Sequence, residues 1–291
     1  MRIVITGGNS GIGRAAALHL ARAGHEVVAT ARNPDGATKL TEEIEAASLP
    51  VSLVRLDVTD DDSVQDCFEL IAADHGPVDV LVNNAGIGSN FTLEDAPMDE
   101  WRGVYEANTF GPVRCTQAVL PSMRERGSGH ICMISSVVGR LASIGQAVYT
   151  SSKWAMEGYS EVLALEVAPF GIDVTIVEPG VTRTAILAKN TSAPDGPYAG
   201  AYARMFAMYL SLIPDAPEAD LTARVIEEAI TTPDPKLRWR SGDDAEAMLA
   251  GRAQLSDEEF LQLANADDER YRELWQDWFG IDLSAGFPGP V

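Results

Sequence analysis

Tyr149 and Lys153 are the side chains of this 291-residue sequence best suited to acid–base chemistry. They lie in a stretch of good helix formers, where a spacing of four places both on one helix face. A free phenol, with a pKa near 10, is a poor base at neutral pH, and a neighbouring ammonium lowers that pKa. The pair therefore predicts proton transfer to or from a substrate oxygen. The same pair is also common on solvated helix surfaces.

Two serines, Ser135 and Ser136, follow a predicted strand at residues 130–134. A hydroxyl at the end of a strand is placed to donate a hydrogen bond to a substrate carbonyl. The sequence therefore predicts that a serine assists Tyr149 at the carboxyl edge of a sheet.

A glycine-rich segment, residues 6–13, joins a predicted strand to a predicted helix. Glycine permits a positive φ and a close approach of the backbone to a pyrophosphate, which the helix N-terminus attracts. The strand-turn-helix context favours a dinucleotide site over an ordinary tight turn. The residues we expect to contact the dinucleotide here are Gly7, Asn9, Ser10, Gly11, Ile12 and Gly13.

The end of the next predicted strand bears on which dinucleotide binds. An acid about 20 residues beyond the glycines is typical of NAD sites, but this sequence has Thr30, Ala31 and Arg32 there. The guanidinium of Arg32 suits a 2′-phosphate, so NADP(H) is favoured over NAD(H). The alternative is a surface arginine, with Asp35 as the acid.

Runs of β-branched residues alternate with helical stretches along the first half of the chain. Predicted strands fall at residues 2–6, 26–31, 51–56, 78–83, 130–134 and 172–177, and predicted helices at 12–23, at 37–47 and from 60 onward. This alternation is typical of a parallel sheet covered on both faces. The prediction is a doubly wound α/β domain, a three-layer α/β/α Rossmann fold.

The pattern changes after Pro179. Residues 185–217 carry four prolines around an apolar stretch at 205–213, and we expect a loop with a short helix there. A helix at 218–231 and a short strand at 237–239 follow. Residues 243–291 hold 12 acidic and 3 basic residues and predict two acidic helices. The predicted single domain thus comprises a core (1–184), a substrate loop or lid (185–217) and an acidic extension (243–291).

The composition excludes several classes of protein. A formal net charge of −21 disfavours nucleic-acid binding. No apolar run reaches the roughly 20 residues of a membrane span, and the glycine-rich segment begins too early for a secretory signal to precede it. Three separated cysteines (Cys67, Cys115, Cys132) fit a reducing cytoplasm, and four histidines without HExxH spacing disfavour a metal site. We expect a cytoplasmic protein without metal.

Taken in order, these segments resemble the short-chain dehydrogenase/reductase family over roughly residues 1–240. The resemblance rests on a TGxxxGIG loop at 6–13, an NNAG segment at 83–86, the YxxxK pair, and a PGxxxT segment at 179–184. Ser136 lies thirteen residues before Tyr149, the family's usual separation, which favours it over Ser135. The remaining matches are Asp57 and Val58 after the third strand, and Asn108 in a helix.

The resemblance implies four catalytic residues. Tyr149 would exchange a proton with the substrate oxygen, Lys153 would bind the nicotinamide ribose and lower the tyrosine pKa, and Ser136 would polarise the substrate oxygen. Asn108 would hold a water that links Lys153 to solvent. Alternatively, Asn108 bonds the helix turn before it.

The resemblance also implies further contacts with a nicotinamide dinucleotide, the cofactor that carries the hydride. Thr184 and the backbone at Thr182 would hold the carboxamide. Beside the glycine-rich segment and Arg32, the implied contacts are Asp57, Val58, Asn84, Ala85, Gly86, Tyr149, Lys153, Pro179, Gly180, Thr182 and Thr184. Asn83 and Asn84 could instead satisfy buried backbone groups, and Pro179-Gly180 would end a strand in any protein.

Apolar residues near the predicted site indicate a lipophilic substrate, such as a steroid, retinoid or aromatic ketone. They flank the catalytic residues (Val137, Val138, Leu141, Ile144, Val148) or belong to the predicted lid (Met205, Phe206, Met208, Tyr209, Leu210). An ordinary hydrophobic core would give the same pattern. The family resemblance implies that the chain oxidises or reduces a carbonyl or secondary alcohol, and that it self-associates as a homodimer or homotetramer.

Two other function classes stay open. One is a non-catalytic dinucleotide sensor, against which the joint presence of Ser136, Tyr149, Lys153 and Asn108 argues. The other is a nucleotide-sugar epimerase or dehydratase. Those enzymes share YxxxK, but they usually carry TGxxGxxG and a larger C-terminal domain.

Overall fold

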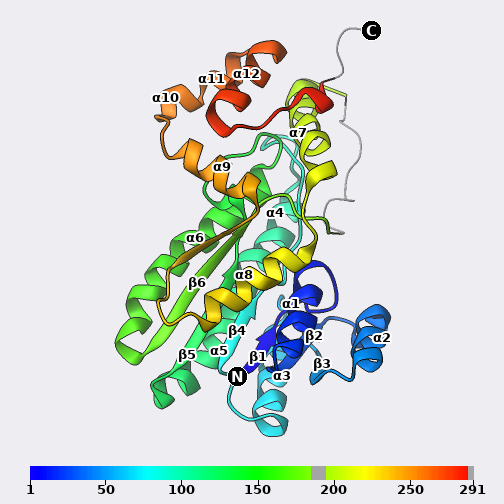
Figure 1. The fold of residues 1–291 in the computed structure, drawn as a ribbon, viewed down its shortest axis with the longest axis vertical. Helices are drawn as coiled ribbons and strands as arrows, with labels where there is room; N and C mark the ends of the chain where they lie inside the picture. Colours follow the sequence, from blue (N-terminus) through cyan, green and yellow to red (C-terminus); the bar gives the residue numbers. More distant parts are fainter. Residues whose placement is uncertain (185–194, 288–291) are drawn as a thin grey trace.

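A seven-stranded parallel sheet organises the residues that this computed structural model describes, 1–184 and 195–287 (Figure 1). Its order is β3-β2-β1-β4-β5-β6-β7, and all neighbouring strands run parallel. The chain reverses its direction of winding between β1 and β4, a switch point at which open α/β sheets bind ligands. The predicted doubly wound fold is confirmed. The strands are β1 (Arg2–Ile5), β2 (Glu26–Ala31), β3 (Val51–Arg55), β4 (Val80–Asn83), β5 (Gly129–Ile134), β6 (Ile172–Pro179) and β7 (Arg238–Ser241).

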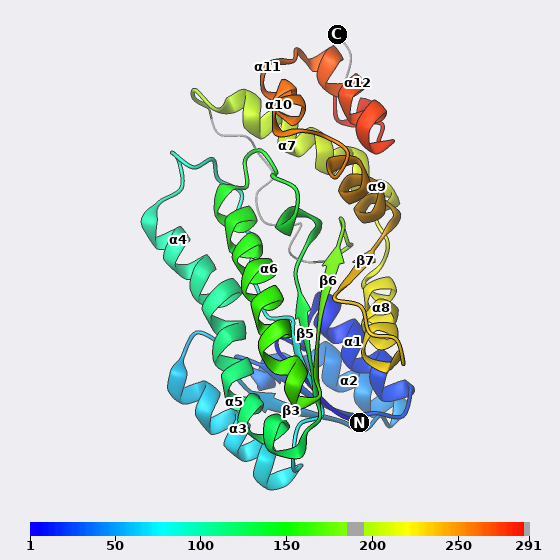
Figure 2. The ribbon, with the colours of Figure 1, turned by 90° about the vertical axis from the view of Figure 1, so that its left-hand side faces the viewer.

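Helices cover both faces of the sheet (Figure 2). One hydrophobic core lies under α1 (Gly11–Arg22), α2 (Thr38–Ala47) and α8 (Ala219–Thr231). A second lies under α3 (Asp61–Asp74), α5 (Gly111–Arg126) and α6 (Ala147–Val167). The central strands β1 and β4 are mostly apolar because parallel strands are buried on both faces. These layers fix the carboxyl ends of the strands at one edge.

Most sequence-predicted boundaries agree with the structure to within one or two residues. The predicted helix start at Asp60 is a cap, since the Asp60 carboxylate accepts a hydrogen bond from the Ser63 N–H at 2.9 Å. The helix in the predicted lid is longer than expected: α7 (Ala199–Leu212) has 14 residues. Residues 185–194 of that predicted lid lie outside the described residues.

In its described part, residues 243–287, the acidic extension forms four α-helices where the sequence predicted two: α9 (Asp243–Arg252), α10 (Asp257–Phe260), α11 (Gln262–Asn265) and α12 (Asp268–Phe279). Local capping causes the breaks. Ser256 and Glu259 form a capping box that starts α10. Ala266 is extended, and Asp267 then caps α12 by accepting from the Arg270 N–H.

A third hydrophobic core lies beyond the carboxyl edge of the sheet, where α9 and α12 pack on α7 and on η3 (Val137–Gly139). Figure 1 shows α7 and α9–α12 together above the sheet. Arg204 of α7 donates to the Leu263 carbonyl at 3.0 Å and to that of Ala266, and lies 4.6 Å from the centre of the Tyr271 ring. The extension is therefore packed against the predicted lid.

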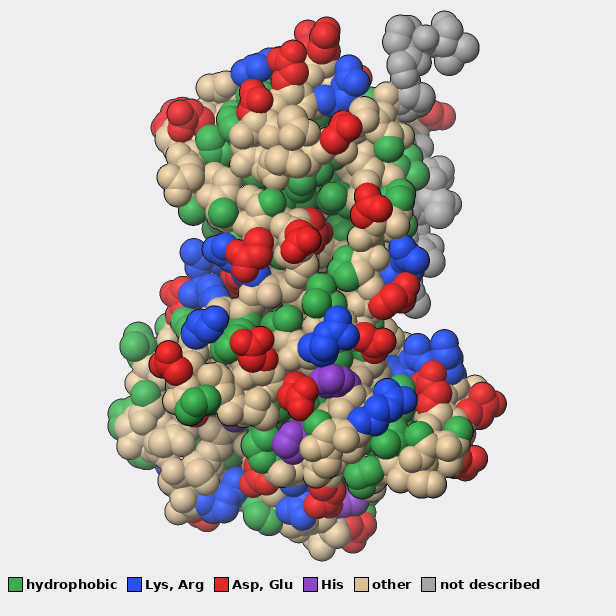
Figure 3. All heavy atoms as spheres, in the orientation of Figure 1, with side chains coloured by type: hydrophobic (Ala, Val, Ile, Leu, Met, Phe, Trp, Pro, Cys, Tyr) green, Lys and Arg blue, Asp and Glu red, His purple; other side chains and the backbone are tan. Residues whose placement is uncertain are grey.

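The outer surface carries the excess of acidic side chains. On the face in Figure 3 they are scattered among basic and apolar groups and do not form one patch. Within the described ranges, no helix has the length and hydropathy needed to cross a bilayer.

The remaining described helical elements are α4 (Met98–Tyr105), the π-helical η2 (Glu106–Phe110) and the short 3₁₀ turns η1 (Pro34–Gly36), η4 (Ala168–Phe170), η6 (Ile213–Asp215) and η7 (Ser284–Gly286).

Candidate active site

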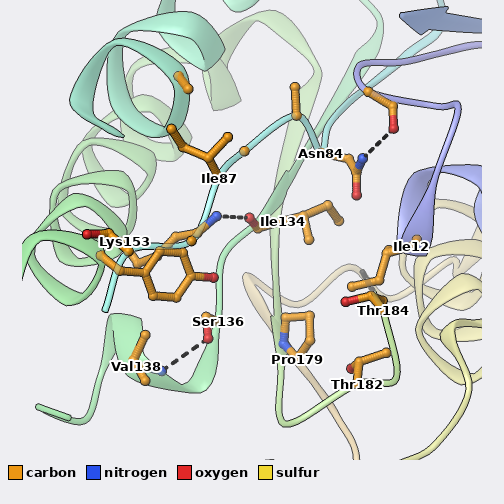
Figure 4. Close-up of a pocket in the computed structure, with 18 of the residues that line it drawn as sticks. Ile12, Asn84, Ile87, Ile134, Ser136, Val138, Lys153, Pro179, Thr182 and Thr184 are labelled. Atoms are coloured by element: carbon orange, nitrogen blue, oxygen red, sulfur yellow. Dashed lines mark hydrogen bonds between the residues drawn. The ribbon is translucent and has the colours of Figure 1, made fainter. Parts of the chain in front are cut away.

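A long cleft crosses the carboxyl edge of β1, β4, β5 and β6, and it brings together nearly all the residues that the sequence predicted. Of the predicted catalytic and cofactor residues, only Gly13 and Asn108 are absent from its lining. Figure 4 shows Ser136 and Lys153 on one side of it, Ile12, Thr182 and Thr184 on the other.

The glycine-rich turn after β1 forms one end of the cleft. Gly7 has a φ of 63°, a conformation that favours glycine. Gly13 lies beneath the turn, where a Cβ would come within 2.4 Å of the Asn84 Nδ2 and of the Gly7 carbonyl oxygen. The turn therefore packs too tightly for side chains at these positions. The first backbone N–H groups of α1 follow it, as anion binding requires.

Thr6 and Asn84, the residue after β4, fasten that turn. The Thr6 hydroxyl accepts from the N–H groups of Asn84 and Ala85, both at 2.9 Å, and the Asn84 side chain donates to the carbonyls of Thr6 and Gly7. Asn84 thus satisfies backbone groups, the structural role considered as an alternative, and also lines the cleft. Asn83 instead bonds another side chain, donating to the Thr116 hydroxyl at 3.0 Å.

Arg32 lies at the end of β2, exposed and lining the cleft, whereas Asp35 does not line it. Arg32 makes no ion pair with another described residue. Its charge helps to hold the pKa of Asp57 below the ordinary value, although hydrogen bonds from Thr59 contribute more and burial opposes them. This end of the cleft therefore presents a guanidinium to a bound ligand.

Tyr149, Ser136 and Lys153 meet where α6 crosses the end of β5. Ser136 lies close enough to the Tyr149 phenol to lower its pKa, and its Oγ accepts from the Val138 N–H at 3.4 Å. Lys153 follows one turn later on α6, with its Nζ 5.8 Å from the centre of the Tyr149 ring. These three side chains can bind an oxygen and exchange a proton with it.

The surroundings of Tyr149 favour the protonated phenol. Burial raises its pKa above the usual value, nearby Tyr209 adds to the rise, and Ser136 opposes it. The sequence predicted the opposite direction, from the ammonium of Lys153. That ammonium instead donates to the Ile134 carbonyl at 2.7 Å (Figure 4).

The Lys153 ammonium is buried beside a second charge. Burial lowers the pKa of Lys153 to about 8, and the Glu157 carboxylate, one turn further along α6, opposes that shift. Glu157 accepts from the Arg238 Nε at 3.1 Å, and Arg238 also pairs with buried Glu178. Burial raises the pKa of Glu178 to about 7. A buried charge cluster therefore lies behind Lys153.

The structure also distinguishes the two candidate serines. Burial raises the pKa of the Glu157 carboxyl, and nearby Ser135 opposes the rise. Ser136 instead lies beside Tyr149, whose pKa it lowers against the larger effect of burial. Successive residues at a strand end point in opposite directions, so Ser136 is the serine beside Tyr149.

Asn108 lies in η2, behind the cleft wall. Its side chain accepts from the Ile87 N–H at 2.8 Å and donates to the Ile87 carbonyl at 2.9 Å and the Ser152 hydroxyl at 3.2 Å. It thus holds the chain after the NNAG segment against α6, and its side chain bonds Ile87 and Ser152, not the turn before it in its own helix. None of these three bonds reaches Lys153.

The catalytic end of the cleft is largely apolar. Of the predicted substrate-contacting residues, seven line it: Val137, Val138, Leu141, Phe206, Met208, Tyr209 and Leu210. The other three do not line it. Val148 and Met205 are buried in the protein, and Ile144 is 41% exposed at the surface.

Sequence reasoning missed several lining residues. Ile87–Phe91 simply continues the segment after NNAG, and Gln146 precedes Tyr149 by three residues, a helical spacing that could have indicated it. Met248 of α9 had no local signal, because only the packing of the extension brings it to the cleft.

A nicotinamide dinucleotide fits these residues. The close-packed glycine turn leaves backbone N–H groups for a pyrophosphate, and the cleft continues from it to Tyr149 and Lys153. Asp57, Val58, Thr182 and Thr184 also line this cleft.

Comparison with known proteins agrees with this geometry. Residues 1–195 match the short chain dehydrogenase family. An oxidoreductase of Botryotinia fuckeliana, BOA17, is 36% identical over 275 residues, which cover 93% of this chain and 96% of that protein. Retinol dehydrogenase 8 of Bos taurus is 42% identical over 186 residues, covering 62% of this chain and 59% of that protein.

Solved structures show the same similarity. A short-chain dehydrogenase from Streptomyces avermitilis superimposes with a TM-score of 0.77 at 38% identity, covering 91% of this chain and 94% of that one. A metagenomic short-chain oxidoreductase in complex with NADP gives 0.67 at 28% identity, covering 83% and 97%. The chain belongs to the short-chain dehydrogenase/reductase family, oxidoreductases that use a nicotinamide cofactor on carbonyl or alcohol substrates.

Proposed function

We propose that this protein is an NADP(H)-dependent oxidoreductase that interconverts a lipophilic ketone or aldehyde and its alcohol. The observation that carries the proposal is the meeting of Tyr149, Ser136 and Lys153 at one end of the cleft that begins at the glycine turn. The bound nicotinamide would supply or accept the hydride.

The chain's own residues would manage the proton. Ser136 donates a hydrogen bond to the substrate oxygen, and the Tyr149 hydroxyl gives its proton to that oxygen during reduction or takes one during oxidation. The Lys153 ammonium lies near enough to stabilise the phenolate that remains. Asn108 bonds both Ile87 and Ser152, and so holds the cleft wall at Ile87 against α6.

Arg32 supports the choice of NADP(H). A 2′-phosphate adds negative charge to a ligand of a protein with net charge −21, so a local cation is needed to offset the repulsion. Arg32 lines the cleft and has no carboxylate partner among the described residues. The structural relative in complex with NADP is consistent with this preference.

The apolar lining supports a lipophilic substrate. Side chains from η3, α7 and α9 surround the catalytic end, and a flexible methionine such as Met208 or Met248 adapts to bulky apolar ligands. Retinol dehydrogenase 8, a relative with a lipophilic alcohol in its name, is consistent with such a substrate.

Exposed apolar side chains support self-association through α6. Trp154, Val162 and Leu165 lie on one side of that helix, and Leu165 is 79% exposed. Phe110, at the junction of η2 and α5, is also exposed. A second copy that covers these side chains would form a dimer or tetramer through the helices that contain Asn108 and Tyr149.

Replacing the acid tests the mechanism. Tyr149→Phe removes the transferable proton and should lower kcat by about 10²–10⁴-fold, the contribution typical of a general acid. Cofactor affinity should change little. Turnover is measured with NADPH and a panel of ketones and aldehydes. Tyr159→Phe, on the same helix but bonded to the Thr109 carbonyl, is the control. Undiminished turnover in Tyr149→Phe contradicts the mechanism.

Reversing the charge at residue 32 tests the cofactor. Arg32→Asp should weaken NADPH binding by about 10–100-fold, the effect of a lost charge-assisted hydrogen bond, and leave NADH binding nearly unchanged. Both affinities are measured by titration. Arg55→Asp makes the same charge change on an exposed side chain that does not line the cleft. Equal affinity of the wild type for the two cofactors rules out the 2′-phosphate role.

The pH dependence of kcat/KM tests the ammonium. The activity that needs charged Lys153 is present below its pKa, about 8, and is lost as pH rises through it. Glu157→Gln removes the carboxylate that raises the pKa of Lys153, so activity should be lost at a lower pH than in the wild type. Glu161→Gln is the control, because Glu161 also pairs with Arg238 but lies a turn further from Lys153. An unmoved basic limb in Glu157→Gln would show that Lys153 does not set it.

Charging the exposed face of α6 tests the assembly. Leu165→Glu should reduce the mass measured by sedimentation or light scattering from that of a dimer or tetramer toward a monomer. Leu261→Glu, at a 62% exposed leucine of the extension, should not. A monomeric wild type, or an oligomer indifferent to Leu165→Glu, contradicts the proposed interface.

A further inference from the structure

The end of β6 at Pro179 and the segment after it, residues 180–184, form the side of the cleft opposite Ser136 and Lys153 (Figure 4). The last ladder pair of β6 and β7 is Pro179 with Ser241. Beyond that pair, the described residues contain no further ladder pair between β6 and β7. The backbone N–H groups of the segment must therefore find other acceptors, or remain for a ligand.

Most of these N–H groups are held by the protein. The Gly180 N–H donates to the Ser241 carbonyl at 2.9 Å, and the Arg183 N–H donates to the Pro217 carbonyl at 3.0 Å. The Val181 N–H donates to the Oδ2 of Asp244 at 2.6 Å. The Thr182 N–H has no acceptor among the described residues, although Thr182 is 5% exposed and lines the cleft.

Asp244 comes from the acidic extension, in the first turn of α9. Gly242, with a φ of 109°, turns the chain from β7 into that helix. The Asp244 carboxylate then lies against Gly180, where a Cβ on the glycine would come within 2.1 Å of Oδ1. Burial raises the pKa of Asp244, and the Val181 hydrogen bond opposes the rise. The Asp244 carboxylate therefore accepts the hydrogen bond from the Val181 N–H that a further residue of β7 would otherwise accept.

We propose that Asp244 is a positioning residue for the cofactor. By fixing the Val181 peptide, it turns the next N–H, that of Thr182, toward the cleft, where it donates to the carboxamide of the nicotinamide. This inference rests on the proposed binding of the dinucleotide along the cleft. It assigns a role to the acidic extension, because the extension orients the end of the cofactor that reacts.

A pair of ligands separates this role from a general structural one. NADPH and 2′-phospho-ADP-ribose share the adenosine, 2′-phosphate and pyrophosphate, and only NADPH carries a nicotinamide. Their affinities are measured by titration calorimetry for the wild type, Asp244→Ala and Asp244→Asn, with Asp243→Ala as the control. Asp243 is the exposed neighbour of Asp244 on α9. If the wild type prefers NADH, the pair becomes NADH and ADP-ribose.

Asp244→Ala should weaken NADPH binding about fivefold or more, the effect of one typical hydrogen bond. The affinity for 2′-phospho-ADP-ribose should stay within about twofold of the wild type. Asp244→Asn should be intermediate, because its amide oxygen can still accept from the Val181 N–H. Asp243→Ala should bind both ligands as the wild type does.

Two results overturn the proposal. One is an equal loss of affinity for both ligands in Asp244→Ala, which means that Asp244 only supports the fold. The other is unchanged NADPH affinity in Asp244→Ala. Failure of the wild type to bind any nicotinamide dinucleotide would instead refute the proposed function, so the two failures are distinguishable.

Discussion

The parallel arrangement of the strands is the constraint on which the rest of the molecule depends. Because β1, β4, β5 and β6 all run the same way, the segments that follow them end at one edge of the sheet. The glycine turn, the NNAG segment, Ser136 and the loop at 179–184 are far apart in sequence and share this edge for that reason alone. Bonds from Thr6 to Asn84 and Ala85 fasten the two central segments at the switch point.

Buried charge couples the catalytic helix to the far side of the sheet. Lys153 and Glu157 on α6, Glu178 on β6 and Arg238 on β7 form a group in which each charge lies near an opposite one. Removing one partner of a buried pair costs much more than an exposed pair contributes. The charge of Lys153 is thus stabilised by Glu157, which is itself paired with Arg238 of β7.

The extension contacts both α7, in the predicted lid, and the loop after β6 that lines the cleft. Arg204 bonds α7 to the segment before α12, Met248 contributes to the cleft wall, and Asp244 holds the Val181 N–H. Hydrophobic packing of α9 and α12 on η3 and α7 brings these contacts together. Variation in this part of the chain is therefore expected to change substrate and cofactor handling while leaving the sheet intact.

Local patterns in the sequence determined the strand and helix order, the glycine turn, and the candidate acid and base, because each depends on periodicity or short spacing within a few residues. Only the tertiary structure decided that the Lys153 ammonium bonds the Ile134 carbonyl and that Asn108 holds Ile87. It also brought Asp244 to the loop after β6, whereas the breaks in the extension come from local caps at Ser256 and Asp267. The three tertiary features depend on burial and on contacts between residues up to 63 positions apart, and no local spacing encodes them.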